Sequence, residues 1–146
     1  MPDLAFTPPL DRLVRAVNEH DLETLVDCFA EDYVNHTPAH PARGFVGREQ
    51  VRRNWAHIFA AVPDVRASIL RFAPDGQRVW SEWELSGTRV EGTEFLMRGV
   101  LIMEVPAHTS ISAARFYLEP VEHLSGGADE AVRRAAGDPS NRKEQS

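Results

Sequence analysis

The spacing of apolar residues in this chain changes near Pro63, and that change limits the folds available to it. Before Pro63, apolar side chains recur every three or four residues, as they do on one face of a helix. After it, runs rich in Val, Ile, Phe and Trp are separated by short turn signals, which is typical of antiparallel strands. Helices followed by a run of strands predict an α+β domain.

Three helices and one strand are expected in the first part of the chain. Asp21 is a suitable N-cap for the second helix, and the third begins after Gly47 and ends at Pro63. The strand, Tyr33 to His36, lies in the stretch DYVNHTP between the second and third helices. The three apolar stripes that predict the helices span residues 10–17, 22–29 and 51–62.

Four longer strands follow, at residues 65–73, 77–87, 93–105 and 109–121. Several are apolar on both faces, which fits a sheet covered by helices on one side and by a partner chain on the other. After Leu124 the composition becomes polar, so we expect one domain at residues 1–124 and a partly disordered tail at 125–146, with a short helix near Ala128 to Ala136.

Composition and charge exclude several classes of function. The 146 residues fit one domain, and a formal net charge of −6 argues against a nucleic-acid partner. The single cysteine, Cys28, cannot form an internal disulfide. No apolar run reaches the roughly 20 residues that span a bilayer, and the first residues do not resemble a signal peptide, so a cytoplasmic protein without a membrane partner is expected. Histidine spacing predicts no metal site, and no cofactor motif is present.

The segments NEHDLETLVDCFAEDYVNHTP, GREQVRRNWAHIFAAVPDV, FLMRGV and ARFYLEP resemble the SnoaL-like polyketide cyclases of the nuclear-transport-factor-two-like superfamily. This family is related in fold to limonene epoxide hydrolase and ketosteroid isomerase. The resemblance implies a cone-shaped, curved antiparallel sheet whose concave face is covered by three N-terminal helices. It also implies an apolar pocket inside the cone and no cofactor.

Four residues are predicted to be catalytic. Strand alternation puts Tyr33 and Asn35 on one side of the first strand and His36 on the other, so His36 lines a pocket only if the strand twists or bulges. The resemblance gives Glu119, near the end of the last strand, the role of general acid or base. Family members usually have aspartate there, and a strand-end glutamate without such a resemblance is usually solvated.

The substrate is expected to contact large apolar side chains. Trp80 and Trp83 have opposite parity on the middle strand, and we expect Trp83 to face the pocket. Most such aromatic and methionine side chains are otherwise core residues. The predicted substrate-binding residues are Trp55, Phe59, Trp83, Met97 and Tyr117.

These features together predict a cofactor-free enzyme that cyclises or isomerises a hydrophobic, polyketide- or terpenoid-like small molecule by acid–base catalysis. Tyr33 and Asn35 match the first element of the limonene epoxide hydrolase site, but the middle strand has no arginine two residues before an acid. Two alternatives stay open, an epoxide-opening cyclase or hydrolase and a non-catalytic binder of lipophilic molecules. We also expect a homodimer through the outer face of the sheet, with Phe116 and Leu118 on that face.

Overall fold

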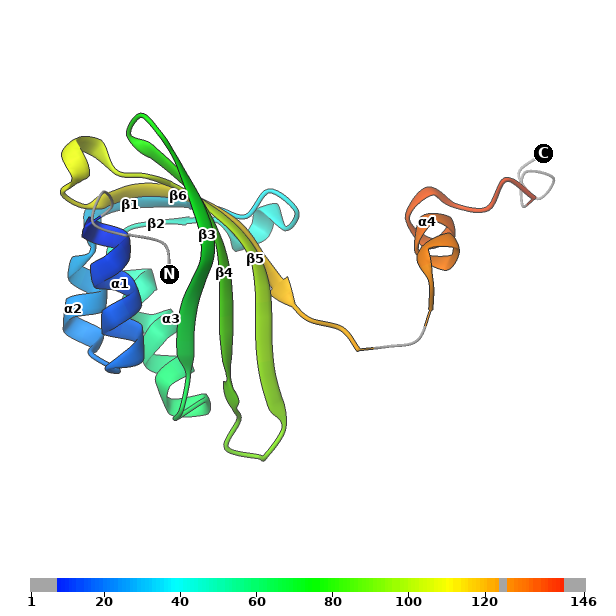
Figure 1. The fold of residues 1–146 in the computed structure, drawn as a ribbon, viewed down its shortest axis with the longest axis horizontal. Helices are drawn as coiled ribbons and strands as arrows, with labels where there is room; N and C mark the ends of the chain where they lie inside the picture. The colour runs from blue at the N-terminus through cyan, green and yellow to red at the C-terminus, as the bar shows by residue number, and fades with distance from the viewer. Residues whose placement is uncertain (1–7, 124–125, 141–146) are drawn as a thin grey trace.

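The computed structural model describes residues 8–123 and 126–140. Three helices lie on one side of a curved sheet, as Figure 1 shows. They are α1 (Pro8–Asn18), α2 (Leu22–Asp27) and α3 (Arg48–Ala61). The strands are β1 (Phe29–His36), β2 (Phe45–Val46), β3 (Arg66–Asp75), β4 (Arg78–Thr88), β5 (Glu94–Glu104) and β6 (Ile111–Pro120). Two short 3₁₀ turns, η2 (Pro41–Arg43) and η3 (Pro106–His108), and a last helix, α4 (Ala128–Ala136), complete the described elements.

The six strands form one sheet in the order β2-β1-β6-β5-β4-β3. All neighbouring strands are antiparallel except β1 and β6, which run parallel, so the sheet is mixed. The predicted α+β fold with three N-terminal helices is confirmed. The first strand starts four residues earlier than expected, at Phe29, because Phe29 pairs with Ile111 of β6, a contact that local spacing does not reveal.

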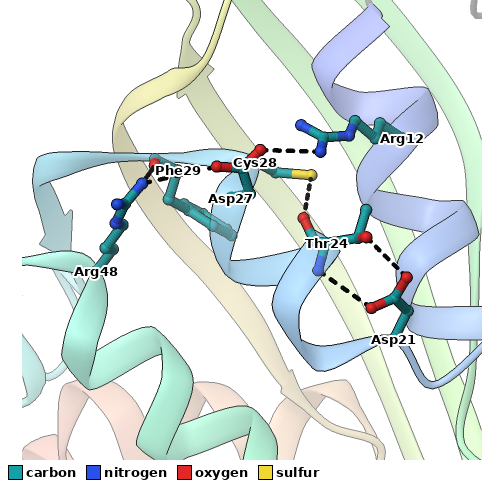
Figure 2. Close-up of polar contacts among 7 residues, drawn as sticks. All are labelled: Arg12, Asp21, Thr24, Asp27, Cys28, Phe29 and Arg48. Atoms are coloured by element: carbon teal, nitrogen blue, oxygen red, sulfur yellow. Dashed lines mark hydrogen bonds and ion pairs between the residues drawn. The ribbon is translucent and has the colours of Figure 1, made fainter.

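Figure 2 shows how α2 begins and ends. The carboxylate of Asp21 accepts hydrogen bonds from the Thr24 amide at 3.2 Å and from the Thr24 hydroxyl at 2.7 Å, which confirms the predicted N-cap. At the other end, the Cys28 thiol donates to the carbonyl of Thr24 at 3.3 Å. Burial raises the pKa of Cys28 to about 11, so this side chain is a neutral thiol in the core.

Two arginines connect α1 and α3 to the junction of α2 and β1 (Figure 2). Arg12 of α1 donates to Asp27 at 2.9 Å, and Arg48 of α3 donates to the carbonyl of Phe29 at 3.4 Å. These contacts hold the three helices around the start of β1. The arrangement positions α3 opposite the concave face of the sheet.

The faces of β4, β5 and β6 follow from one continuous antiparallel register. Trp83 of β4 lies opposite Gly99 of β5, which lies opposite Leu118 of β6. Because Trp83 is buried under the helices, Phe116 and Leu118 also face inward. The expectation that Phe116 and Leu118 lie on the outer face is therefore wrong. It followed from the role given to Glu119, whereas Arg115, Tyr117 and Glu119 make the opposite face of β6 the more polar one.

Gly99 allows β5 and β6 to approach closely. Its φ is +155°, and a Cβ at this position would lie 2.1 Å from the Tyr117 carbonyl oxygen and 2.7 Å from the Leu118 Cα. Both neighbours are backbone atoms, so relief of the clash requires the strands to separate. Glycine is consequently required at the centre of the sheet.

We expect Gly99→Ala to reduce the free energy of unfolding by about 1–3 kcal/mol, because the added methyl group overpacks the backbone. Urea denaturation would measure this loss as a lower midpoint. Gly127→Ala is the matched control, since Gly127 has a φ of −97° and no neighbouring atom within 4 Å of the new Cβ. Equal stability of Gly99→Ala and the wild type would show that β5 and β6 tolerate the methyl group, and that glycine is not required there.

Helix α4 buries none of its residues. The expected short helix at Ala128 to Ala136 is present. The predicted disorder of the final residues concerns 141–146, which lie outside the described residues. No helix in the described ranges is long and apolar enough to cross a membrane.

Deletion of residues 125–146 is expected to leave the melting temperature within a few degrees of the full chain, because α4 contributes no buried surface. Differential scanning calorimetry of the two proteins would measure the difference. A large decrease would instead show that this segment packs on the domain.

Candidate functional site

A cavity of about 260 Å³ lies between the helices and the concave face of the sheet. Most of its wall is apolar and comes from α1, α3 and strands β1 and β4–β6. Its polar or charged lining residues with an available donor or acceptor are Tyr33, Asn35, Thr37, Arg43 and Asn54. An apolar cavity with a few converging polar groups is the usual form of a small-molecule site.

Tyr33, Asn35 and Thr37 form a hydrogen-bonded chain along β1 and its end. The Tyr33 hydroxyl donates to Asn35 Oδ1 at 2.9 Å, and Asn35 Nδ2 donates to Thr37 Oγ1 at 3.2 Å. Alternate residues of a strand point to one face, which explains why all three line the cavity. Because each group donates to the next, the Thr37 hydroxyl proton and the second Asn35 N–H are the donors that the chain can offer to a ligand.

Tyr33 is almost completely buried among aromatic rings. Its ring centroid lies 4.7 Å from that of Phe29 and 6.0 Å from that of Phe45. Burial raises the pKa of the Tyr33 hydroxyl above its ordinary value, because the phenolate would be poorly solvated there. Tyr33 therefore stays a neutral hydrogen-bonding group at physiological pH.

The structure brings three of the five predicted substrate-binding residues into the cavity wall. Trp55 of α3, Trp83 of β4 and Met97 of β5 all line it. The Trp83 indole N–H donates to Ser81 Oγ at 2.8 Å, which fixes the ring in the wall. Phe59 lies behind this wall, where its ring packs 5.6 Å from that of Trp55. The roles of these residues in binding stay predictions.

Three other predicted site residues lie away from the cavity. The expectation that Tyr117 and Glu119 line it is wrong, whereas His36 lies on the side where strand alternation put it. Register with β5 puts Tyr117 and Glu119 on the face opposite Phe116 and Leu118, and His36 pairs with Arg115 on that outer face. Glu119 Oε1 lies within hydrogen-bond distance of His40 Nε2, at 2.8 Å, and both side chains are partly exposed. The physical reason is strand parity, since no bulge interrupts β6 beside β5 to turn these side chains inward.

Sequence reasoning missed Thr37, Arg43 and Asn54. Thr37 continues the alternation of Tyr33 and Asn35, and this extension of the strand pattern was the signal for it. Asn54 precedes Trp55 on α3, but the helical stripe contains only apolar residues. Arg43 lies in η2, in a Pro- and Gly-containing loop whose spacing carries no signal for its direction.

The cavity has an unusual charge balance for an acid–base enzyme. Among the described residues, no carboxylate and no imidazole lines it, and Arg43 supplies its one formal charge. The described ranges also contain no group of three His, Cys, Asp or Glu side chains suited to hold a metal ion. The arrangement can therefore bind an apolar molecule and donate hydrogen bonds to its oxygen atoms.

Comparison with known proteins agrees with this fold. A family model described as a SnoaL-like domain matches residues 10–113. A loop truncation variant of IdmH is 25% identical over 77% of this chain and 91% of its own, with a TM-score of 0.65. No curated protein matches the chain significantly.

Two Mycobacterium tuberculosis structures show the same fold at lower identity. One, crystallised with estradiol-17beta-hemisuccinate, is 21% identical over 75% of this chain and 90% of its own, with a TM-score of 0.65. The other, an LEH-like epoxide hydrolase, is 16% identical over 77% and 81%, also with a TM-score of 0.65. Since the family model spans well over half of the 146 residues, the chain belongs to the SnoaL-like family.

Proposed function

We propose that this protein is an enzyme that cyclises or isomerises a hydrophobic, oxygen-bearing small molecule inside the cone. The observation that carries the proposal is the hydrogen-bonded polar corner formed by Tyr33, Asn35 and Thr37 in a mostly apolar cavity. A carbonyl or epoxide oxygen of a polyketide- or terpenoid-like substrate would lie at this corner. The apolar wall would bind the rest of the molecule and exclude water.

The polar corner would act by hydrogen bonding to negative charge that develops on the substrate oxygen. The chain from Tyr33 through Asn35 to Thr37 is already oriented, so little reorganisation is needed when the charge forms. One such donor in a dry site contributes about 3–4 kcal/mol to transition-state stabilisation. Burial opposes the ionisation of Tyr33, so its hydroxyl keeps donating to Asn35 and holds the Asn35 N–H donors in place.

The same cavity supports ring closure or isomerisation better than hydrolysis. Hydrolysis of an epoxide needs a group that activates water, and no carboxylate lines the described cavity. In an intramolecular reaction the substrate supplies its own nucleophile, held close to the reacting carbon by the walls. The product would then be an isomer of the substrate rather than its hydrate.

A non-catalytic binder of lipophilic molecules is the second candidate. The absence of an acid or base from the described cavity lining favours it. A relative of the same fold crystallised with estradiol-17beta-hemisuccinate is consistent with such a role. Turnover separates the two candidates, since a binder raises its melting temperature with the ligand but forms no product.

We expect Tyr33→Phe to reduce turnover by about 10- to 1,000-fold, because it removes the hydroxyl that orients Asn35. Apolar hydroxy-epoxides and dicarbonyl compounds would be incubated with the protein, and products separated by chromatography and identified by mass. Unchanged mass identifies an isomer, and added water identifies hydrolysis. Glu119→Gln is the control, and it should keep activity close to that of the wild type because Glu119 lies outside the cavity. A large loss of turnover in Glu119→Gln with little loss in Tyr33→Phe would assign the acid–base role to Glu119 and reject the proposal.

A homodimer through the outer face of the sheet is also proposed. Trp80 and Tyr117 leave 46% and 41% of their surface exposed, on adjacent rows of this face. Val100 and Ile102 lie between them, and the ion pairs Arg98–Glu84 and Arg71–Glu82 lie at the edge of the apolar area. An apolar area with a charged border is typical of an interface.

Light scattering at micromolar concentration should give about twice the 16.4 kDa chain mass. Trp80→Lys should shift the protein to monomer, because a charge would be buried between the two sheets. Val90→Lys is the control, since Val90 is 73% exposed in the turn after β4. A monomeric wild type would exclude the dimer.

A further inference from the structure

Two exposed polar side chains, Arg43 and Asn54, lie at the mouth of the cavity. Among the lining residues, Arg43 and Asn54 are the exposed ones, whereas the others are buried or partly buried. Arg43 comes from the loop between β1 and β2, and Asn54 comes from α3 on the helical side. A ligand whose apolar body fills the cavity would therefore leave its polar end between these two residues.

Both residues present hydrogen-bond donors to this end. Gln50 donates to Asn54 Oδ1 at 2.8 Å, which leaves the Asn54 Nδ2 hydrogens for a ligand. A guanidinium has five N–H donors and no acceptor. A mouth composed of a cation and an amide N–H₂ is suited to an anion and unsuited to a cation.

Arg43 has no acidic partner among the described residues, unlike Arg48 and Arg52 of α3. Arg48 is near Asp27, and Arg52 pairs with Glu23 and Glu49. The loop that carries Arg43 is held by a hydrogen bond from its own amide to the His40 carbonyl at 2.9 Å and by one from Gly44 to Pro41 at 3.1 Å. The backbone of Arg43 is thus fixed at the mouth while its charge is available to a ligand.

We propose that the molecule bound in the cavity is an apolar carboxylate, whose anionic end pairs with Arg43 and Asn54. This inference rests on the proposed function of the cavity as a small-molecule site. Arginine binds a carboxylate with two parallel hydrogen bonds, and the apolar wall selects the hydrocarbon part. The Asn35 and Thr37 donors, which line the same cavity, would meet a second oxygen of the same molecule.

The test compares binding of matched anionic and neutral probes by calorimetry. The probes are 2-naphthoate, octanoate and decanoate, each with its primary amide. The wild type should bind at least one carboxylate about 10- to 100-fold more tightly than its amide, the usual contribution of a charged hydrogen-bonded pair. Arg43→Gln should remove this preference and leave amide binding unchanged, and Arg43→Lys should restore part of it.

Arg66→Gln is the matched control, because it removes the same charge from an exposed position outside the cavity lining. It should keep the wild-type preference for the carboxylate. Equal binding of carboxylates to the wild type and Arg43→Gln, or binding of no carboxylate, would overturn the inference. Failure of the proposed function would be a separate result. In that case Tyr33→Phe would change neither turnover nor amide binding, with arginine or with glutamine at position 43.

Discussion

The unbroken register of β4, β5 and β6 is the constraint on which the cavity depends. Because side chains alternate along each strand, one inward residue fixes the direction of every other residue in the three strands. Trp83 is inward, so Met97, Phe116 and Leu118 are also inward, and Tyr117 and Glu119 are outward. Gly99 occupies the centre of this inward face and permits the close contact of β5 with β6. The apolar wall of the cavity follows from these pairings together with the helices that cover them.

The fold could be predicted from the sequence more completely than the site. The reason for each success or error depends on the element that carries the residue. Helical and strand periodicity are local, so the three helices, the four long strands and the Asp21 cap were correctly predicted. Tyr33 and Asn35 were placed on one face because they lie two residues apart in a strand, and this needs no knowledge of the partner strands. In β6 the apolar residues Phe116 and Leu118 alternate with Arg115, Tyr117 and Glu119, and the catalytic role given to Glu119 outweighed this pattern until the pairing with β5 showed which face is inside. The direction of Arg43 depends on a loop conformation, which periodicity does not describe.

The distribution of charge separates this site from one built around a buried carboxylate. Glu119 and His40 contact each other at 2.8 Å outside the cavity, where solvent can reach both. Inside, the described polar groups are neutral donors, and the cation lies at the mouth. Binding and orientation would then depend on groups that keep one protonation state across the physiological pH range. The ligand itself would bring any proton that moves.

The parallel pairing of β1 with β6 has a consequence for how the protein is made. Phe29 pairs with Ile111, and Asn35 pairs with Ala114, so the first and last strands of the domain are neighbours in space. Contacts between distant parts of a chain form slowly, because a long loop must first close. During synthesis, the polar corner on β1 stays without its neighbouring strand until β6 has left the ribosome. A nascent chain that stops before β6 therefore exposes the apolar wall of the future cavity, and it is the form of this protein most open to aggregation or to capture by a chaperone.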